Sequence, residues 1–198
     1  MEKNNCNDFN EIVEILSQTK NLILVSSRSG GGKTRFLLKL LPYLTFNHNP
    51  KNKNDKYLEL QHILGEDKYI LFITDSHLNY LKTIIDHNSP LNQKIVFSNQ
   101  IDKNMSFEKF QYIIFDAGYV SNADFDDLLE KTRGISTLIK SISYRTDMNN
   151  IASISYKTQH NAFFHININE FKYPSNFNIS IKKARHSDLV GKKIDLHL

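Results

Sequence analysis

The sequence predicts an α/β fold with a mostly parallel central sheet, and three features of the chain indicate it. Short apolar runs of strand length alternate with segments whose apolar residues recur at helical spacing. The apolar runs are nearly continuous rather than alternating with polar residues, as in strands that helices cover on both faces. A glycine-rich turn joins the first apolar run to a helical segment, and the length of 198 residues suits one domain, residues 1–198.

The front of the chain alternates predicted helices and strands. Helices are expected at residues 9–16, 35–44, 57–64, 77–85 and 122–132, strands at 21–26, 69–74, 94–97 and 110–115, and a further apolar segment at 135–142. Residues 45–56 are rich in Asn and Lys, which predicts a flexible loop. The last third changes character, because apolar and polar residues alternate there and predict strands at 151–158, 163–171, 178–184 and 193–198. We therefore expect a β-rich C-terminal end.

Composition excludes several classes of protein. The formal net charge of +4 and the pI of about 9.0 favour an anionic partner but do not establish nucleic-acid binding. Cys6 is the single cysteine, so neither an intramolecular disulfide nor a cysteine-based metal site is expected. The polar N-terminus does not resemble a signal peptide, and no apolar run approaches the length of a membrane span. We expect a cytoplasmic protein that does not bind a membrane.

A phosphate-binding loop is the most specific motif of the chain. It follows a predicted strand, opens a predicted helix, and consists of Ser27, Arg28, Ser29, Gly30, Gly31, Gly32, Lys33 and Thr34. The glycines let successive backbone N–H groups turn toward phosphate oxygens, and the helix N-terminus adds its partial positive charge. Lys33 is expected to contact the β- and γ-phosphates of ATP, and the Thr34 hydroxyl to ligate Mg²⁺. Ser27 stands where the usual motif has glycine; the alternative interpretation is an ordinary glycine-rich turn before a helix.

Two aspartates follow predicted strands and complete the expected site. Asp116 comes directly after an apolar strand, where a carboxylate holds magnesium in phosphate-loop proteins; alternatively it caps a turn. Residue 117 is Ala117, so an acid that activates water must come from elsewhere. Asp75, after the strand at 69–74, is the candidate general base, and the equally weighted alternative is that Asp75 or Ser76 caps the following helix.

With these residues in place, the chain resembles the RecA-type ATPases, and within them the core of DnaB-type replicative helicases. The loop resembles the family pattern in its small first residue, Arg28 and Lys33–Thr34, and Asp75 falls where the family has its catalytic Glu. The C-terminal segment resembles the family's closing hairpin, in which Lys183 and Arg185 form a Lys-x-Arg motif. The resemblance implies a three-layer RecA-like fold, and it implies that these two cations reach the γ-phosphate bound by a neighbouring subunit. The alternative is a hairpin with solvated charges.

The resemblance implies a function and leaves alternatives open. The first hypothesis is an oligomeric ATPase, helicase-like, acting in DNA replication, recombination or unwinding, with single-stranded nucleic acid contacted by loop 143–150. The second is an ATP-binding subunit with weak or no hydrolysis, which assembles as a homo-oligomer or hetero-oligomer. A small-molecule kinase is disfavoured, because the final third of the chain is predicted to form strands and not a helical lid. Ser143 or Arg145 is expected to serve as the polar sensor.

Overall fold

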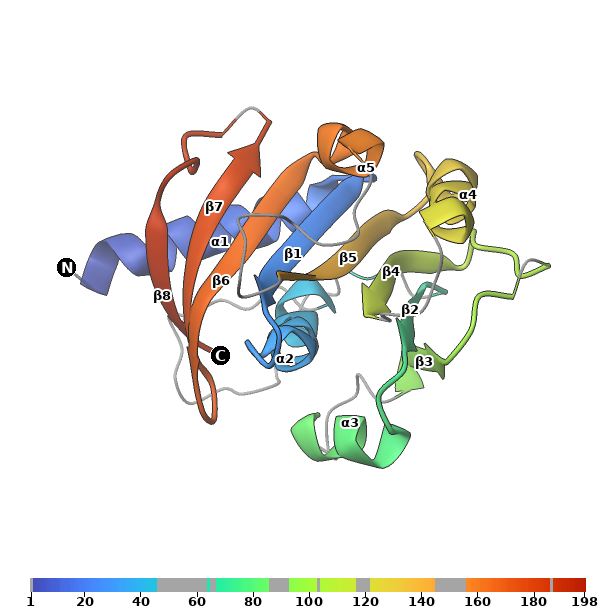
Figure 1. Ribbon diagram of the computed structural model, residues 1–198, viewed down its shortest axis with the longest axis horizontal. Coiled ribbons are helices and arrows are strands. Elements are labelled where there is room, and N and C mark those ends of the chain that lie inside the picture. Colours follow the sequence, from blue (N-terminus) through green and yellow to red (C-terminus); the bar gives the residue numbers. More distant parts are fainter. Residues whose placement is uncertain are drawn as a thin grey trace.

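A single sheet forms the centre of the computed structural model, which describes residues 2–45, 64, 67–85, 93–102, 104–116, 122–144, 156–185 and 187–198. Eight strands lie in the order β3-β2-β4-β5-β1-β6-β7-β8 (Figure 1). The strands are β1 (Leu22–Arg28), β2 (Tyr69–Thr74), β3 (Ile95–Ser98), β4 (Phe110–Asp116), β5 (Thr137–Tyr144), β6 (Phe164–Lys172), β7 (Asn176–Ala184) and β8 (Lys193–His197). The helices are α1 (Glu2–Gln18), α2 (Lys33–Thr45), α3 (Leu78–Ile84), α4 (Asn122–Thr132) and α5 (Tyr156–Asn161).

In the sheet order, the six strands from β3 to β6 are parallel to one another. β1 lies between β5 and β6, while β4 lies between β5 and β2. Their apolar runs are buried; the burial of β1, for example, is broken only at Arg28. Parallel strands place their carboxyl ends at one edge of the sheet, so β1, β4, β5 and β2 all end beside one another.

The expected three-layer RecA-like fold with a mostly parallel sheet is wrong. The sheet is mixed, because β7 runs antiparallel to both β6 and β8; the expected β-rich C-terminal end is present and consists of these strands. The physical reason is the length of the connections. Only three residues, 173–175, connect β6 to β7 and only eight, 185–192, connect β7 to β8, whereas a parallel pair needs a crossover of a dozen residues or more.

Helix packing over the sheet is correspondingly uneven. One core cluster joins α1, α2 and α3 to a face that includes strands β6, β7 and β8. The second cluster packs α4 against the opposite face of β1, β2, β4 and β5, and among the described residues it contains none from β6, β7 or β8. Figure 1 shows α1 behind the last three strands. A helix layer on both faces is therefore found over part of the sheet only.

Most predicted elements of the front half are present, with shifted ends. The β2 and α4 segments have the predicted bounds, whereas α1 is longer than expected. The strand predicted at 151–158 is wrong where it is described, because Tyr156–Asn161 is helix α5. This segment lies within the connection between the parallel strands β5 and β6, which needs a crossover. Most of the predicted helix 57–64, of loop 45–56 and of loop 143–150 lies outside the described residues.

No helix in the described part of the chain is both long and apolar enough to cross a membrane.

A buried lysine, Lys140 on β5, is a notable feature of the second core cluster. Its side chain is 7% exposed, and its Nζ lies 3.5 Å from the ring centroid of Phe125 and 5.8 Å from that of Phe115. Burial lowers the pKa of Lys140 to about 8, while the Asp126 carboxylate acts in the opposite direction. The two aromatic faces stabilise the charged form in part, but the buried amine still loses its proton at a lower pH than an exposed lysine does.

Replacing Lys140 with Met is expected to remove a pH dependence of stability. The folded-state pKa of about 8 lies below the ordinary value of 10.5, so between these values the unfolded chain binds a proton that the folded chain has lost. The free energy of unfolding of the wild type should therefore rise with pH across this window, by on the order of 3 kcal/mol in total. Urea unfolding at several pH values checks this, with Lys131→Met on the exposed face of α4 as control. Parallel pH profiles for wild type and Lys140→Met would contradict it.

Candidate phosphate-binding site

The glycine-rich loop lies at the carboxyl end of β1, as the sequence predicts. Strand β1 runs through Ser27 to Arg28, and helix α2 begins at Lys33. The N–H of Gly31 donates to the Arg28 carbonyl at 3.0 Å, which closes a turn. The N–H of Phe36 donates to the Gly32 carbonyl at 2.8 Å and starts the helical pattern. The first N–H groups of the 13-residue helix α2 therefore point back toward the loop.

Two of the three glycines are required by close contacts. A Cβ on Gly31 would lie 2.5 Å from the Ser27 hydroxyl oxygen, and a Cβ on Gly32 would lie 2.7 Å from the ring of Phe171. Gly32 also has a φ of +79°, which side chains rarely adopt. Gly30 has a φ of +72° but open space around it. Phe171 comes from the β6–β7 hairpin, so the loop packs directly on the C-terminal strands.

Lys33 is held within the loop by weak hydrogen bonds. Its Nζ donates to the Ser27 hydroxyl at 3.3 Å and to the Arg28 carbonyl at 3.4 Å. The Ser27 hydroxyl donates in turn to the Arg28 carbonyl at 2.8 Å. Burial lowers the pKa of Lys33, and the charge of Asp116 partly opposes this shift. Ser27, at the position where the motif usually has glycine, thus supplies an acceptor for the lysine.

Asp116 and Thr34 meet as the sequence predicts. The Thr34 hydroxyl donates to Oδ2 of Asp116 at 2.5 Å. Asp116 is 8% exposed, and the other oxygen of its carboxylate, Oδ1, accepts a hydrogen bond from the Ser141 hydroxyl. Ser141 lies on β5, the strand between β1 and β4. Ser141 is not among the residues predicted from the sequence, which are Ser143 or Arg145; Ser143 is exposed and pairs with Ser27 across β1 and β5, and Arg145 lies outside the described residues. The only feature of the sequence that distinguishes Ser141 is a hydroxyl side chain within an apolar strand.

The tip of the β6–β7 hairpin contacts the first turn of α2. Arg35, next to Thr34, donates to the Pro174 carbonyl at 3.0 Å. The guanidinium carbon of Arg35 lies 4.8 Å from the ring centroid of Tyr173, which is 76% exposed. An exposed aromatic ring, stacked with a cation, thus lies beside the loop. No local sequence pattern predicts this ring beside the loop, because only the tertiary fold brings the hairpin there.

Asp75 lies on the expected edge of the sheet. It directly follows Thr74, which pairs with Asp116 across β2 and β4. Asp75 is exposed, as are Arg28 and Ser29 in the loop. A role of Asp75 as general base stays a prediction. The cap on α3 is His77, which makes no side-chain capping hydrogen bond, so neither Asp75 nor Ser76 occupies the N-cap position.

Lys183 and Arg185 do not join the loop. Lys183 pairs with His165, which pairs with Leu24 of β1, so it is level with the amino-terminal part of that strand. Its Nζ donates to the carbonyls of Gln159 at 3.1 Å and His160 at 2.8 Å, at the end of α5. Leu24 lies four positions before Arg28 in β1, a distance of roughly 13 Å along the strand. Within one chain, these cations therefore lie at the sheet edge opposite the loop.

Gly32→Ala is expected to destabilise the fold more than Gly30→Ala. Both substitutions force an alanine into a positive φ, at a cost of about 1–2 kcal/mol each, but only the Cβ at position 32 meets the Phe171 ring. Gly30→Ala is thus the matched control for backbone strain. Urea unfolding of the two variants measures the difference, and equal losses of stability would show that the hairpin does not press on Gly32.

Magnesium at this site would depend on few protein atoms. Among the described residues, no group of three or more His, Cys, Asp or Glu side chains gathers as a metal site. The Thr34 hydroxyl and the Asp116 carboxylate are oxygen atoms of the kind that Mg²⁺ prefers, and a magnesium ion bound with a nucleotide takes further ligands from phosphates and water.

No protein-family model matches the chain, and no curated protein matches it. The function is therefore argued from the geometry of the loop and its surroundings.

Proposed function

We propose that the protein binds ATP together with magnesium at residues 27–34 and Asp116. One observation carries the proposal: the Thr34 hydroxyl and the Asp116 carboxylate are 2.5 Å apart, beside the Lys33 amine in the same loop. An ordinary glycine-rich turn requires neither a lysine folded back over it nor a buried carboxylate from a strand two positions away in the sheet. A triphosphate with its cation uses both.

Each group has a distinct role in this proposal. The loop N–H groups and the amino end of α2 would bind phosphate oxygens through hydrogen bonds and partial positive charge. Lys33 makes only hydrogen bonds of 3.3 and 3.4 Å, which it can exchange for stronger contacts with charged oxygens. Thr34 and Asp116 would hold magnesium, which neutralises phosphate charge when bound. Tyr173 is exposed and lies next to Arg35, so its ring would stack on the adenine base.

Hydrolysis needs groups beyond those of the binding site. Asp75 is the proposed base, and it is on the same sheet edge as Asp116. Lys183 and Arg185 lie at the opposite edge and would act only on a nucleotide bound by another subunit. We therefore propose an oligomeric ATPase, with DNA replication, recombination or unwinding as its field of action and single-stranded nucleic acid as a candidate partner.

A second proposed function is an ATP-binding subunit of a protein assembly with little or no hydrolysis of its own. For an isolated chain, the position of Lys183 and Arg185 favours this second function over hydrolysis. Both cations donate to the His160 carbonyl, Lys183 at 2.8 Å and Arg185 at 3.4 Å, in place of any contact with their own loop. Turnover measured at several protein concentrations separates the two proposals, since an active homo-oligomer gains specific activity as it assembles.

Lys33→Ala is expected to weaken ATP binding by at least about tenfold, because charge-assisted hydrogen bonds contribute roughly 1.5–3 kcal/mol. Titration with a fluorescent ATP analogue measures the affinity, and thermal unfolding confirms that the variant is folded. Lys39→Ala removes a lysine from the same helix and serves as control. Wild-type affinity in folded Lys33→Ala would refute the proposed phosphate site.

Asp116→Asn is expected to raise the magnesium concentration needed for tight ATP binding, because it removes a negative charge while retaining a side chain that can hydrogen-bond Thr34 and Ser141. Ser141→Ala is the matched comparison, since it deletes one partner of the carboxylate but leaves the charge. Its effect on the magnesium dependence should be smaller. Titrations of magnesium at fixed ATP provide the test, and the same midpoint for Asp116→Asn as for wild type would argue against the metal role.

A further inference from the structure

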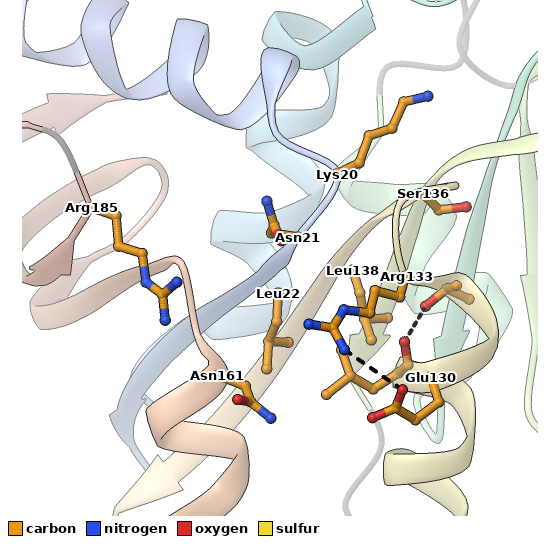
Figure 2. Close-up of a pocket in the computed structure, with 11 residues that line it drawn as sticks. Lys20, Asn21, Leu22, Glu130, Arg133, Ser136, Leu138, Asn161 and Arg185 are labelled. Atoms are coloured by element: carbon orange, nitrogen blue, oxygen red, sulfur yellow. Dashed lines mark hydrogen bonds and ion pairs between the residues drawn. The ribbon is translucent and has the colours of Figure 1, made fainter.

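A pocket lies at the sheet edge opposite the phosphate loop, where β1 and β5 begin and α4 and α5 end (Figure 2). Its volume is about 100 Å³. Strand and helix termini supply all its walls, which are formed by Lys20, Asn21, Leu22, Leu129, Glu130, Thr132, Arg133, Ser136, Leu138, Asn161 and Arg185. None of these residues belongs to the proposed ATP site except Arg185, whose proposed role there concerns a second subunit.

The size and the floor of the pocket restrict its ligand. Pockets for drug-sized molecules enclose roughly 300–1,000 Å³, so a pocket of about 100 Å³ accepts a group of a few heavy atoms rather than a nucleotide. Leu22 and Leu138 are 2% and 1% exposed and form an apolar base, which Leu129 extends. These leucines at the floor of the pocket suit a short aliphatic group.

Two arginines give the pocket its charge. In Figure 2 the guanidinium groups of Arg185 and Arg133 lie on opposite sides of Leu22. Among the described residues, Arg185 has one acceptor, the His160 carbonyl at 3.4 Å, and Arg133 has one ion-pair partner, Glu130 at 3.9 Å. The Glu130 and Arg133 side chains are 57% and 77% exposed, so their pairing contributes little and leaves donors for another anion. Lys20 points away from the two arginines in this view.

We propose that this pocket binds a carboxylate carried on a short aliphatic group. The aliphatic part would cover the leucines, and the carboxylate would accept hydrogen bonds from Arg133 and Arg185, each of which presents a planar fork of donors. The amides of Asn21 and Asn161, at the same pocket, add polar partners. Two kinds of molecule carry such a carboxylate: a free small acid, and a polypeptide with a glutamate side chain. The inference does not rest on ATP binding, because the two sites occupy opposite edges of the sheet.

An NMR titration of the full chain with butyrate tests the pocket. Butyrate should produce saturable shifts of the Leu22 and Leu138 amide signals, with a dissociation constant of roughly 1–10 mM, and leave the signals of Gly30 and Gly31 unchanged. Butyramide, which has the same shape without charge, should not saturate. Arg133→Gln and Arg185→Gln should each weaken butyrate binding about tenfold, whereas Lys131→Gln, the removal of a charge from α4 beside Asp127, should not.

A second arm distinguishes the two sources of the carboxylate. N-acetylglutamate α-amide presents the glutamate side chain as a polypeptide does. Tighter binding of this compound than of butyrate assigns the pocket to an acidic protein partner, and tighter binding of butyrate assigns it to a small acid. The proposal fails if neither compound saturates, if butyramide binds equally well, or if the arginine substitutions leave binding unchanged. Both arginines are exposed, and the amide spectra report directly whether the variants are folded.

Discussion

The buried carboxylate of Asp116 is the constraint on which the candidate site depends. Asp116 is 8% exposed, and its carboxylate requires hydrogen-bond donors because an unpaired buried charge costs several kcal/mol. The Thr34 and Ser141 hydroxyls supply them, one to each oxygen. These bonds tie the first turn of α2 to the end of β4 and to the middle of β5, although β5 separates β4 from β1 in the sheet. The loop between β1 and α2 is thereby fixed at its helical end.

The antiparallel part of the sheet, which contradicts the expected fold, supports the loop from the other side. β6 continues beyond its pairing with β1, so that Phe171 lies against Gly32 and Pro174 accepts a hydrogen bond from Arg35. A hairpin can extend past the edge of the sheet in this way because its two strands pair with each other. Phe171 is stacked on Phe177, with ring centroids 4.9 Å apart, which fixes the ring that contacts the glycine. The mixed topology therefore has a local consequence for the site.

Sequence patterns predicted the parts of the site that are local in the chain. The loop from Ser27 to Thr34 could be identified because a strand, glycines and a helix follow one another, and Asp116 because it ends an apolar strand. Ser141 and Tyr173 could not be identified, since their roles arise from sheet order and from the path of the β6–β7 hairpin. The mixed sheet was missed because alternating patterns reveal strands but not their direction. Helix α5 was missed because its six residues contain little periodic signal.

Strand polarity divides the chemistry of this protein between two edges. The carboxyl ends of the parallel strands hold the Asp116 carboxylate, hydroxyl groups and the Lys33 amine, while their amino ends hold two arginines at a pocket that is partly lined by leucines. The position of Arg185, just past the end of β7, follows from the antiparallel pairing of β7 with β6, because a parallel strand would end at the opposite edge. The same pairing that separates this cation from its own phosphate loop brings it to the pocket beside Leu22. Any direct contact of Arg185 with a bound phosphate therefore requires a second molecule, whereas its contact with a carboxylate in the pocket requires none.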